Sequence, residues 1–319
     1  MTDSSRAYKE AAFERDGHTV SKSPWGPDDE IGRLNWITPE SQAAVLGRLA
    51  PTKTFDLSVS YFLNMPGFFD AGDPKYDIWM THTPRGSILD GLTGIPPELQ
   101  AVHTYAGDAI TMYTHTGTHM DMLNHFGYHG HFWNGWTPEE HLGSRHWLKG
   151  GADKYPNIVA RGVMLDVAGL HGVDCLPDSY EIPPKDLEAA AREQGTELRR
   201  GDIVMVRTGR MKHWPDYEAY ANDAPGLGVP AARYLCEETS SMCIGSDNDS
   251  LECYPCAEGT FFPVHSYMFA TAGAQIIESL WLEELAGEQV YEVAFIGGPL
   301  KLTGSTGSPM RPLAIPLAS

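Results

Sequence analysis

One histidine-rich stretch, residues 112–136, constrains the fold of this chain more than any other feature. His115, His119, Asp121 and His125 place four potential metal ligands within eleven residues. Eight of the 13 histidines fall within about a seventh of the chain, so an even distribution does not account for the cluster. We therefore predict a metal site here and disfavour a histidine-rich surface loop without a metal.

The spacing of these ligands restricts the backbone that carries them. All four positions are odd-numbered, so they share one face of an extended strand. A straight strand separates residues four apart by roughly 13 Å, whereas ligands lie about 2 Å from one ion. Gly117 can adopt a positive φ cheaply and is the expected position of the bend. A helix is disfavoured because threonine and glycine surround the first histidines and Asp121 would point elsewhere. The stretch therefore predicts a strand, a glycine bend and then a loop.

Charge and hydropathy exclude several classes of protein. The 319 residues carry a formal net charge of −19, which disfavours nucleic acid and anionic lipid as partners. The first 17 residues lack the apolar core of a signal peptide, and no later run is apolar enough to span a membrane. We expect a soluble cytoplasmic protein that acts on a small molecule.

The five cysteines do not make a disulfide scaffold in a chain of this length, and we expect them to be reduced. Cys253 and Cys256 form an isolated C-x-x-C pair that could be a redox pair or half of a zinc knuckle. Without a second such pair, we interpret it as a loop with two free thiols. Asp247, Asp249 and Glu252 could similarly hold a hard cation, although an acidic chain contains many such loops.

Strand and helix patterns alternate along the chain and predict a single α/β domain with a long N-terminal arm. The N-terminal arm and a short helix, capped by Thr38, occupy residues 1–54, and the main domain occupies residues 55–319. Residues 64–100 are rich in Gly, Pro and Asp and are interpreted as a candidate lid or substrate wall. The expected strands are 55–63, 162–167, 201–208, 242–245, 274–277 and 290–296, and the expected helices are 39–49, 184–193, 231–239 and one after His265.

A second pair of residues, His265 and Glu278, could join the cluster. On one continuous helix they would point about 220° apart. Gly273 breaks that helix, so a turn and a returning strand could bring them together. From the pattern alone, a helix cap or a satisfied core histidine remains an equally open interpretation of His265.

The run His115-Thr116-Gly117-Thr118-His119-Met120-Asp121, followed by His125, resembles the H-x-G-T-H-x-D-x-P-x-H motif of the cyclase family. That family includes bacterial kynurenine formamidases and isatin hydrolases. Flanking stretches are similar to the family over nearly the whole chain, including Pro263-Val264-His265 and Ile276-Ile277-Glu278. Leu123 stands where the motif has proline, and the chain is much longer than the formamidases.

The resemblance implies a set of roles and an architecture. It makes His115, His119 and Asp121 metal ligands and adds His265 and Glu278 as ligands of the same or a neighbouring ion. It makes His125 the acid/base residue, so that His125, His265 and Glu278 form the expected catalytic group. It also implies a swivelling β/β/α domain and a homodimer or homotetramer.

The resulting hypothesis is a hydrolase that uses one or two zinc or manganese ions to open an amide, imide or lactone carbonyl. Thr118 and Gly117 would support the ligands from outside the first coordination shell. Aromatic side chains would wall a cyclic or aromatic substrate. These candidate substrate-binding residues are Phe68, Phe69, Tyr113, Trp133 and Trp136.

Three other functions remain open from the sequence. The same ion could stabilise an enolate in a lyase or dehydratase, with His125 moving a proton at carbon. Two histidines and a carboxylate also form the facial triad of oxygen-activating iron proteins. The chain could instead bind a metal or a ligand without turnover.

Overall fold

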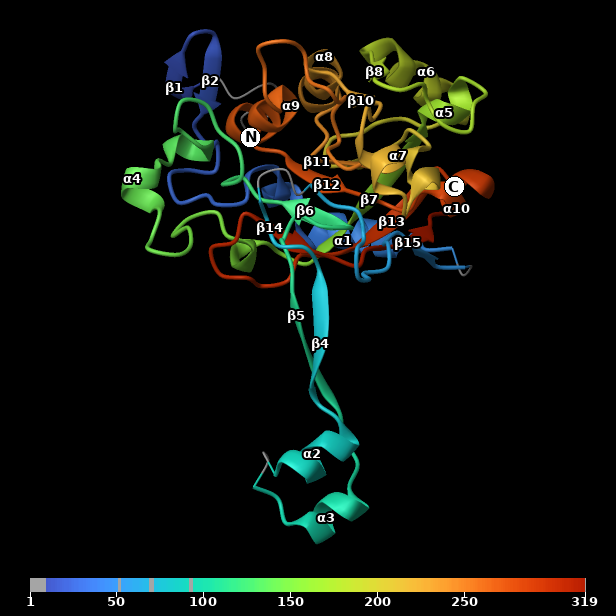
Figure 1. Cartoon of the computed structure of the whole chain (residues 1–319). Coiled ribbons are helices and arrows are strands. Elements are labelled where there is room, and N and C mark those ends of the chain that lie inside the picture. The colour runs from blue at the N-terminus through green and yellow to red at the C-terminus, as the bar shows by residue number, and fades with distance from the viewer. Residues whose placement is uncertain (1–9, 51–52, 69–71, 92–93, 319) are drawn as a thin grey trace.

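The computed structural model describes residues 10–50, 53–68, 72–91 and 94–318. A nine-stranded sheet forms its centre, in the order β14-β6-β12-β11-β9-β7-β13-β15-β3 (Figure 1). The strands are β3 (Phe55–Asp56), β6 (His119–Asp121), β7 (Ile158–Asp166), β9 (Ile203–Arg207), β11 (Cys243–Ser246), β12 (Gln275–Glu278), β13 (Glu292–Gly297), β14 (Gly307–Pro309) and β15 (Leu313–Pro316).

The four central strands β12, β11, β9 and β7 are parallel, and the strands flanking them are antiparallel. Central strands of this kind are covered on both faces and therefore consist of nearly continuous apolar residues. In β9, Val204 and Val206 join the hydrophobic cluster on one face, while Ile203 and Met205 join the cluster on the other. The predicted α/β class with one main domain is confirmed.

Helices cover both faces of the sheet. The predicted helix that ends at Gly195 is confirmed as α6, and Gly195 adopts the left-handed conformation at its C-terminus. The capping role of Thr38 is also confirmed, because its hydroxyl accepts a hydrogen bond from the amide of Ser41. The helices are α1 (Pro39–Leu46), α2 (Pro84–Asp90), α3 (Pro97–Val102), α4 (Pro138–His141), α5 (Val167–Leu170), α6 (Pro184–Gln194), α7 (Tyr217–Ala221), α8 (Val229–Arg233), α9 (Pro263–Ser266) and α10 (Glu283–Gly287).

The described part of the N-terminal segment, residues 10–50, packs onto the main domain. It begins with a hairpin of β1 (Ala11–Arg15) and β2 (His18–Ser21). Further along, the buried guanidinium of Arg33 donates to the carbonyls of Ala272, Cys236 and Ser241. These bonds tie the segment to the centre of the molecule.

A long projection leaves the body of the molecule (Figure 1). Strands β4 (Asp77–His82) and β5 (Gly107–Thr111) form an antiparallel ribbon that carries α2 and α3 at its far end. We call residues 77–111 the arm. Residues 64–100, interpreted as a candidate lid or substrate wall, are divided between two places: Phe68 and Asp73 line a pocket of the body, whereas residues 77–100 build the arm and point away from the body.

Other boundaries also differ from the sequence-based expectation. The strand expected at 55–63 is limited to Phe55–Asp56, and strands β14 and β15 near the C-terminus were not predicted. A further small pair joins β8 (Glu181–Ile182) and β10 (Gly226–Leu227). Within the described residues, no helix is long and apolar enough to cross a membrane.

Candidate metal centre and pocket

Three neighbouring strands bring Glu278 next to the histidine-rich segment. Strand β6 lies between β14 and β12, and His119 stands directly opposite Glu278 in the antiparallel register. Residues opposite one another in such a pair share a face of the sheet, and so do His119 and Asp121, two positions apart. The carboxylate of Glu278 therefore meets the histidine-rich segment although about 160 residues separate them in the chain.

The expected bend occurs at Gly117, which has a φ of +62°. This conformation favours glycine, and an added Cβ would also lie 2.9 Å from the terminal methyl of Met65 and 3.1 Å from the ring of Tyr61. The predicted order of elements was wrong, because His115 lies in the bend and the strand follows it as β6. The bend turns His115 back toward Asp121.

The donor atoms of the first three residues converge. Nδ1 of His115 lies 2.6 Å from Oδ1 of Asp121, and Nε2 of His119 lies 3.2 Å from the same oxygen. The other ring nitrogen of His119 donates to the carbonyl of Gly117, which directs Nε2 toward the carboxylates. One donor atom from each residue lies within 4.8 Å of the others.

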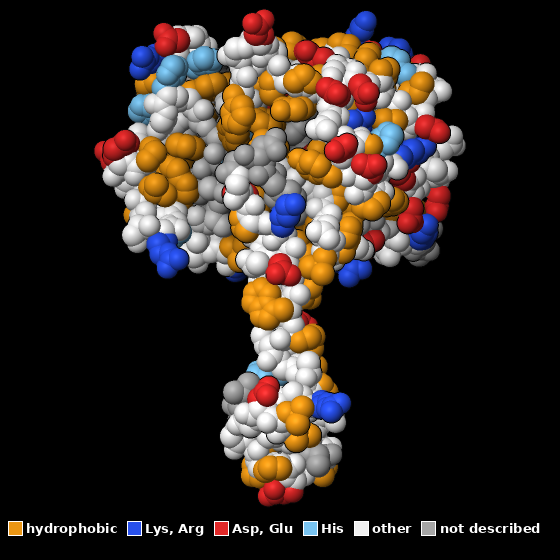
Figure 2. Space-filling model, in the orientation of Figure 1, with side chains coloured by type: hydrophobic (Ala, Val, Ile, Leu, Met, Phe, Trp, Pro, Cys, Tyr) orange, Lys and Arg blue, Asp and Glu red, His pale blue; other side chains and the backbone are white. Residues whose placement is uncertain are grey.

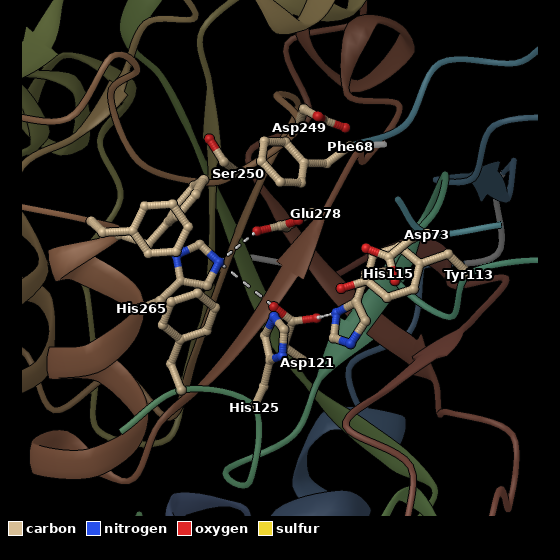
Figure 3. A pocket seen from close by; sticks show the side chains of 13 residues that line it. Phe68, Asp73, Tyr113, His115, Asp121, His125, Asp249, Ser250, His265 and Glu278 are labelled. Atoms are coloured by element: carbon tan, nitrogen blue, oxygen red, sulfur yellow. Dashed lines mark hydrogen bonds and ion pairs between the residues drawn. The ribbon is translucent and has the colours of Figure 1, made fainter. Parts of the chain in front are cut away.

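His265 and Glu278 complete the donor set from the other side. Nε2 of His265 is 3.1 Å from Oε1 of Glu278 and 3.7 Å from Oδ2 of Asp121. Figure 3 shows His115 and His265 on opposite sides of Asp121, both directed toward it. Gly273 makes the predicted turn between helix and strand with a φ of +60°. The structure thus brings together all five residues that the resemblance named as ligands.

The donor set fits a divalent metal ion. Nε2 of His119 and Oδ2 of Asp121 are buried and have no hydrogen-bond partner among the described residues. Buried polar atoms without partners are costly unless an ion or ligand satisfies them. Imidazole nitrogens and carboxylate oxygens are also the ligands that zinc and manganese accept.

The electrostatics of the cluster agree with this assignment. Burial lowers the pKa of His265, but Glu252 and Glu278 outweigh it and raise the value to about 10. For His119, Asp121 and Glu278 likewise outweigh burial and hold the pKa well above its ordinary value. The carboxylates of Asp121 and Glu278 therefore attract positive charge to the site. A metal ion would compete with protons for the donor atoms there.

His125 differs from the other histidines of the cluster. It also lies in the site, with its ring stacked on that of His115 at a centroid separation of 3.9 Å. Burial holds the pKa of His125 well below its ordinary value, and the neighbouring His115 acts in the same direction. No described residue hydrogen-bonds to its ring nitrogens. His125 is consequently a neutral imidazole that borders the pocket and is free to accept a proton.

Glu252 has a role that the sequence did not reveal. Its buried carboxylate accepts a 2.6 Å hydrogen bond from Nδ1 of His265 and further bonds from the amides of Val264 and His265. This pairing fixes the tautomer of His265 so that Nε2 faces Glu278. The sequence indicated Glu252 only as part of an acidic loop. Its separation from His265 along the chain did not predict a contact between them.

A pocket of about 220 Å³ opens directly onto these residues. Figure 3 shows Phe68 and Tyr113 on its walls, with Asp73 and Asp249 among them. Burial raises the pKa of Asp249 to about 7, and the nearby Glu278 acts in the same direction. The remaining walls are mainly aromatic. The lining residues that the structure describes are Phe68, Asp73, Tyr113, His115, Asp121, His125, Phe126, Asp249, Ser250, Phe261, Phe262, His265 and Glu278.

Two of the predicted substrate-binding residues do not reach this pocket. Trp133 is fully buried in the core, where its indole nitrogen donates to Asp29 and its ring fills the space beside Gly273. Trp136 is also buried, and its ring packs against Gly150. Both side chains stabilise the core because their apolar area is large. Phe69 lies outside the described residues, while Phe126, Phe261 and Phe262 are pocket residues that we did not predict.

Thr118 contacts other partners than expected, whereas the interpretation of Cys253 and Cys256 as two free thiols is confirmed. The hydroxyl of Thr118 donates to the carbonyl of Ser279 and accepts from the amide of Val59, so it holds the backbone beside Glu278 and touches no ligand side chain. Cys253 and Cys256 are free thiols, and the latter donates weakly to Glu252.

Comparison with known proteins gives a consistent result. The model of the family named Cyclase matches residues 55–252. An isatin hydrolase from Roseibium aggregatum is 27% identical over 206 residues, which is 57% of this chain and 74% of that protein. A solved structure described as a novel cyclase superposes with a TM-score of 0.81 at 30% identity, covering 91% of this chain and 96% of the other.

A solved isatin hydrolase bound to the product analogue thioisatinate superposes with a TM-score of 0.63. Its identity is 22%, over 88% of this chain and 100% of the other, and at that level it shows the fold alone. The family match covers more than half of the chain and includes the motif whose residues meet in the site. The resemblance inferred from the sequence is confirmed, and the chain belongs to the cyclase family.

Proposed function

We propose that this protein is a metal-dependent hydrolase that opens an amide, cyclic imide or lactone carbonyl in a small cyclic or aromatic substrate. The observation that carries the proposal is a neutral histidine, His125, beside a buried five-residue donor set in an aromatic pocket. The isatin hydrolase relative supports hydrolysis as the type of reaction.

In this proposal the ion is zinc or manganese, held by His115, His119 and Asp121, with His265 and Glu278 as ligands of the same or a neighbouring ion. A divalent ion there supplies Lewis-acid chemistry, because it polarises a carbonyl and lowers the pKa of water toward about 7. The chain contributes the orientation of the ligands. Glu252 holds His265 in one tautomer, and the carbonyl of Gly117 does the same for His119.

His125 carries the proton in this scheme. Its ring borders the pocket, and its low pKa keeps one nitrogen unprotonated at neutral pH. It therefore accepts the proton of the attacking water and returns it to the leaving nitrogen or oxygen. The stacked ring of His115 limits how far His125 can rotate and so positions it for the transfer.

The pocket favours a neutral substrate. Phe68, Phe126 and Phe262 offer flat apolar surfaces, and the volume of about 220 Å³ suits a molecule of one or two rings. The acidic side chains of the lining outside the donor set are Asp73 and Asp249, the latter with a pKa of about 7, and neither lysine nor arginine occurs among the lining residues that the structure describes. A substrate that already carries a carboxylate would be repelled.

The test combines metal analysis with hydrolysis in oxygen-18 water. We expect the purified protein to contain a divalent ion and to place one solvent oxygen in a product carboxylate. Neutral imides, lactones and N-acyl arylamines are the panel, each with a carboxylated analogue. Negligible metal that added zinc or manganese does not restore, or turnover without solvent oxygen in the product, would overturn the proposal.

His125→Ala tests the proton carrier separately. We expect at least about a hundredfold loss of kcat, the lower range for general acid–base catalysis, with the metal content unchanged. His213→Ala is the matched control, because His213 is exposed and lies outside the pocket lining. Equal activity of both variants would remove His125 from the mechanism.

A further inference from the structure

The loop 247–252 follows β11, which lies between the parallel strands β12 and β9, and it contributes Asp249 and Ser250 to the wall of the pocket. In open α/β sheets, ligands bind at the carboxyl ends of the parallel strands, which is where this loop lies. The polar side chains of the loop are consequently placed either to hold its backbone or to contact a substrate.

Most polar side chains of the loop bond to the chain itself. The carboxylate of Asp247 accepts hydrogen bonds from two backbone amides and a hydroxyl just after β9. The side-chain amide of Asn248 donates to a backbone carbonyl at 2.7 Å, and the hydroxyl of Ser250 donates to the carbonyl of Glu252 at 3.1 Å. The carboxylate of Glu252 is bonded within the metal centre. These bonds fix the loop, so the direction of Asp249 is set by its neighbours.

The side chain of Asp249 is the exception. No described residue donates a hydrogen bond to its carboxylate or forms an ion pair with it. Among the described residues, it also belongs to neither group of donor atoms that could hold an ion, so a metal at the centre does not supply the missing partner. Burial is the largest cause of its raised pKa of about 7. A pocket carboxyl without a partner is costly to the free protein and is typical of a residue that serves a ligand.

The position of Asp249 indicates which part of a substrate it meets. Figure 3 shows Asp249 and His125 on opposite sides of Glu278. In the proposed reaction the carbonyl that is attacked lies at Asp121 and His125, so the far edge of the substrate faces Asp249. A volume of about 220 Å³ holds one or two rings, so that edge belongs to the same ring system as the carbonyl.

We propose that Asp249 is a specificity-determining residue that accepts a hydrogen bond from an N–H or O–H group on the far edge of the substrate. The substrate class is then a small cyclic imide, amide or lactone that bears an amino or hydroxyl group on its ring. The inference rests on the proposed function, since the carbonyl at the metal centre decides which edge faces Asp249. Such a donor supplies the partner that the described chain lacks, and a hydrogen bond to the carboxylate favours its charged form.

The same assignment predicts an effect on stability. Asp249→Leu removes a carboxyl that has no partner in the free protein, so the free energy of unfolding should stay the same or rise. Asp247→Leu, two residues away, leaves three donors after β9 without their acceptor and should lower it. Urea denaturation of both variants measures the difference. Comparable losses of stability in the two variants would assign Asp249 a structural role and overturn the proposal.

The binding test uses a matched pair of two-ring imides, 4-aminophthalimide and 4-methylphthalimide, with isothermal titration calorimetry of the full, metal-containing chain. The amino group donates hydrogen bonds, whereas the methyl group of similar size does not. We expect the wild type to prefer the amino compound. The ratio of the two affinities should fall at least about tenfold in Asp249→Leu, the effect of one hydrogen bond to a carboxylate. Comparing ratios cancels the intrinsic difference between the compounds.

Two further variants control this result. Asp249→Asn keeps an acceptor oxygen and should lose only part of the preference. Asp223→Asn should bind like the wild type, because Asp223 is exposed and lies outside the pocket lining. Equal affinity ratios in the wild type and Asp249→Leu, or a wild type that binds neither compound, would overturn the proposal. A loss of metal from Asp249→Asn would make Asp249 a ligand of the ion and would overturn it as well.

The affinity ratio requires no turnover, so this proposal and the proposed function can fail separately. A wild type that prefers the amino compound but hydrolyses neither imide would support the contact of Asp249 and contradict imide hydrolysis. A wild type that hydrolyses both imides with equal kcat/KM and binds them equally would contradict only the contact.

Discussion

The metal centre and the arm are held in opposite ways. His119 and Asp121 are 2% and 1% exposed and are fixed by strands on both sides, whereas Leu89 and Val102 of the arm are 70% and 73% exposed. The neighbouring strands fix the positions of the side chains at the centre, whereas the large apolar side chains of the arm are left exposed (Figure 2). Substitutions in the two regions should therefore change different measured properties of the protein.

The largest expected effect is the loss of catalysis in Asp121→Asn. The substitution preserves shape but removes the charge that faces His115, His119 and His265. Replacing a residue that only hydrogen-bonds to a metal ligand already lowers metal affinity or activity about 10–100-fold. Removing the charge of a ligand itself should therefore reduce activity to background. Turnover and metal content of the same sample are the measurements. Asp108→Asn on the arm is the control, and comparable losses in both would contradict the assignment of Asp121.

The next largest effect concerns the stability of the body. Arg161 of β7 and Asp202 are buried and form an ion pair of 2.5 Å. Replacing Arg161 with Met removes the charged partner of the carboxylate and leaves it the amide of Arg199, which should lower the free energy of unfolding by about 3–5 kcal/mol. Urea denaturation measures the change. A loss below about 1 kcal/mol would show that the pair is solvated.

The pH dependence of that variant sharpens the test. Burial raises the pKa of Asp202 to about 6, with Arg161 opposing the shift. A carboxyl whose folded pKa exceeds its unfolded value stabilises the fold most at low pH, and this contribution is lost as pH rises through the folded pKa. Without Arg161 the pKa rises further. The loss in free energy of unfolding caused by Arg161→Met should consequently be larger at about pH 8 than at about pH 5.

Glu252→Gln should have a smaller effect on the metal centre. The amide can still accept from the backbone but no longer offers a charge to Nδ1 of His265. We expect metal affinity to fall about 10–100-fold with the fold intact. Competition with a chelator measures this change. Glu258→Gln is the control, because Glu258 is exposed on the same loop, and equal affinities of the two variants would exclude a positioning role for Glu252.

The sequence predicted much of the centre and little of the arm for physical reasons. Ligand spacing and Gly117 indicated a bent segment, because only a bend brings residues four apart to one ion. The position of Glu278 depended on the register of β6 with β12, which no local pattern encodes. Glu252 was missed for the same reason, since its contact with His265 arises from a loop of irregular conformation.

Two aromatic residues show where local reasoning fails. Trp133 and Trp136 lie near the ligands in sequence, yet the short helical turn Trp133–Gly135 places both rings in the core. In the arm, the prolines that begin α2 and α3 were visible, but without an apolar periodicity no element was assigned. A segment whose large apolar side chains are exposed lacks the inward-facing pattern on which such predictions rest.

The smallest expected effect separates the two regions most directly. Trp79→Ala on the arm should change the free energy of unfolding of the dilute chain by less than about 0.5 kcal/mol, because Trp79 is 48% exposed there. Trp133→Ala in the core should cost about 3–5 kcal/mol under the same conditions. A loss above about 1 kcal/mol in dilute Trp79→Ala would mean that the arm packs against its own body and would remove the distinction between the two regions.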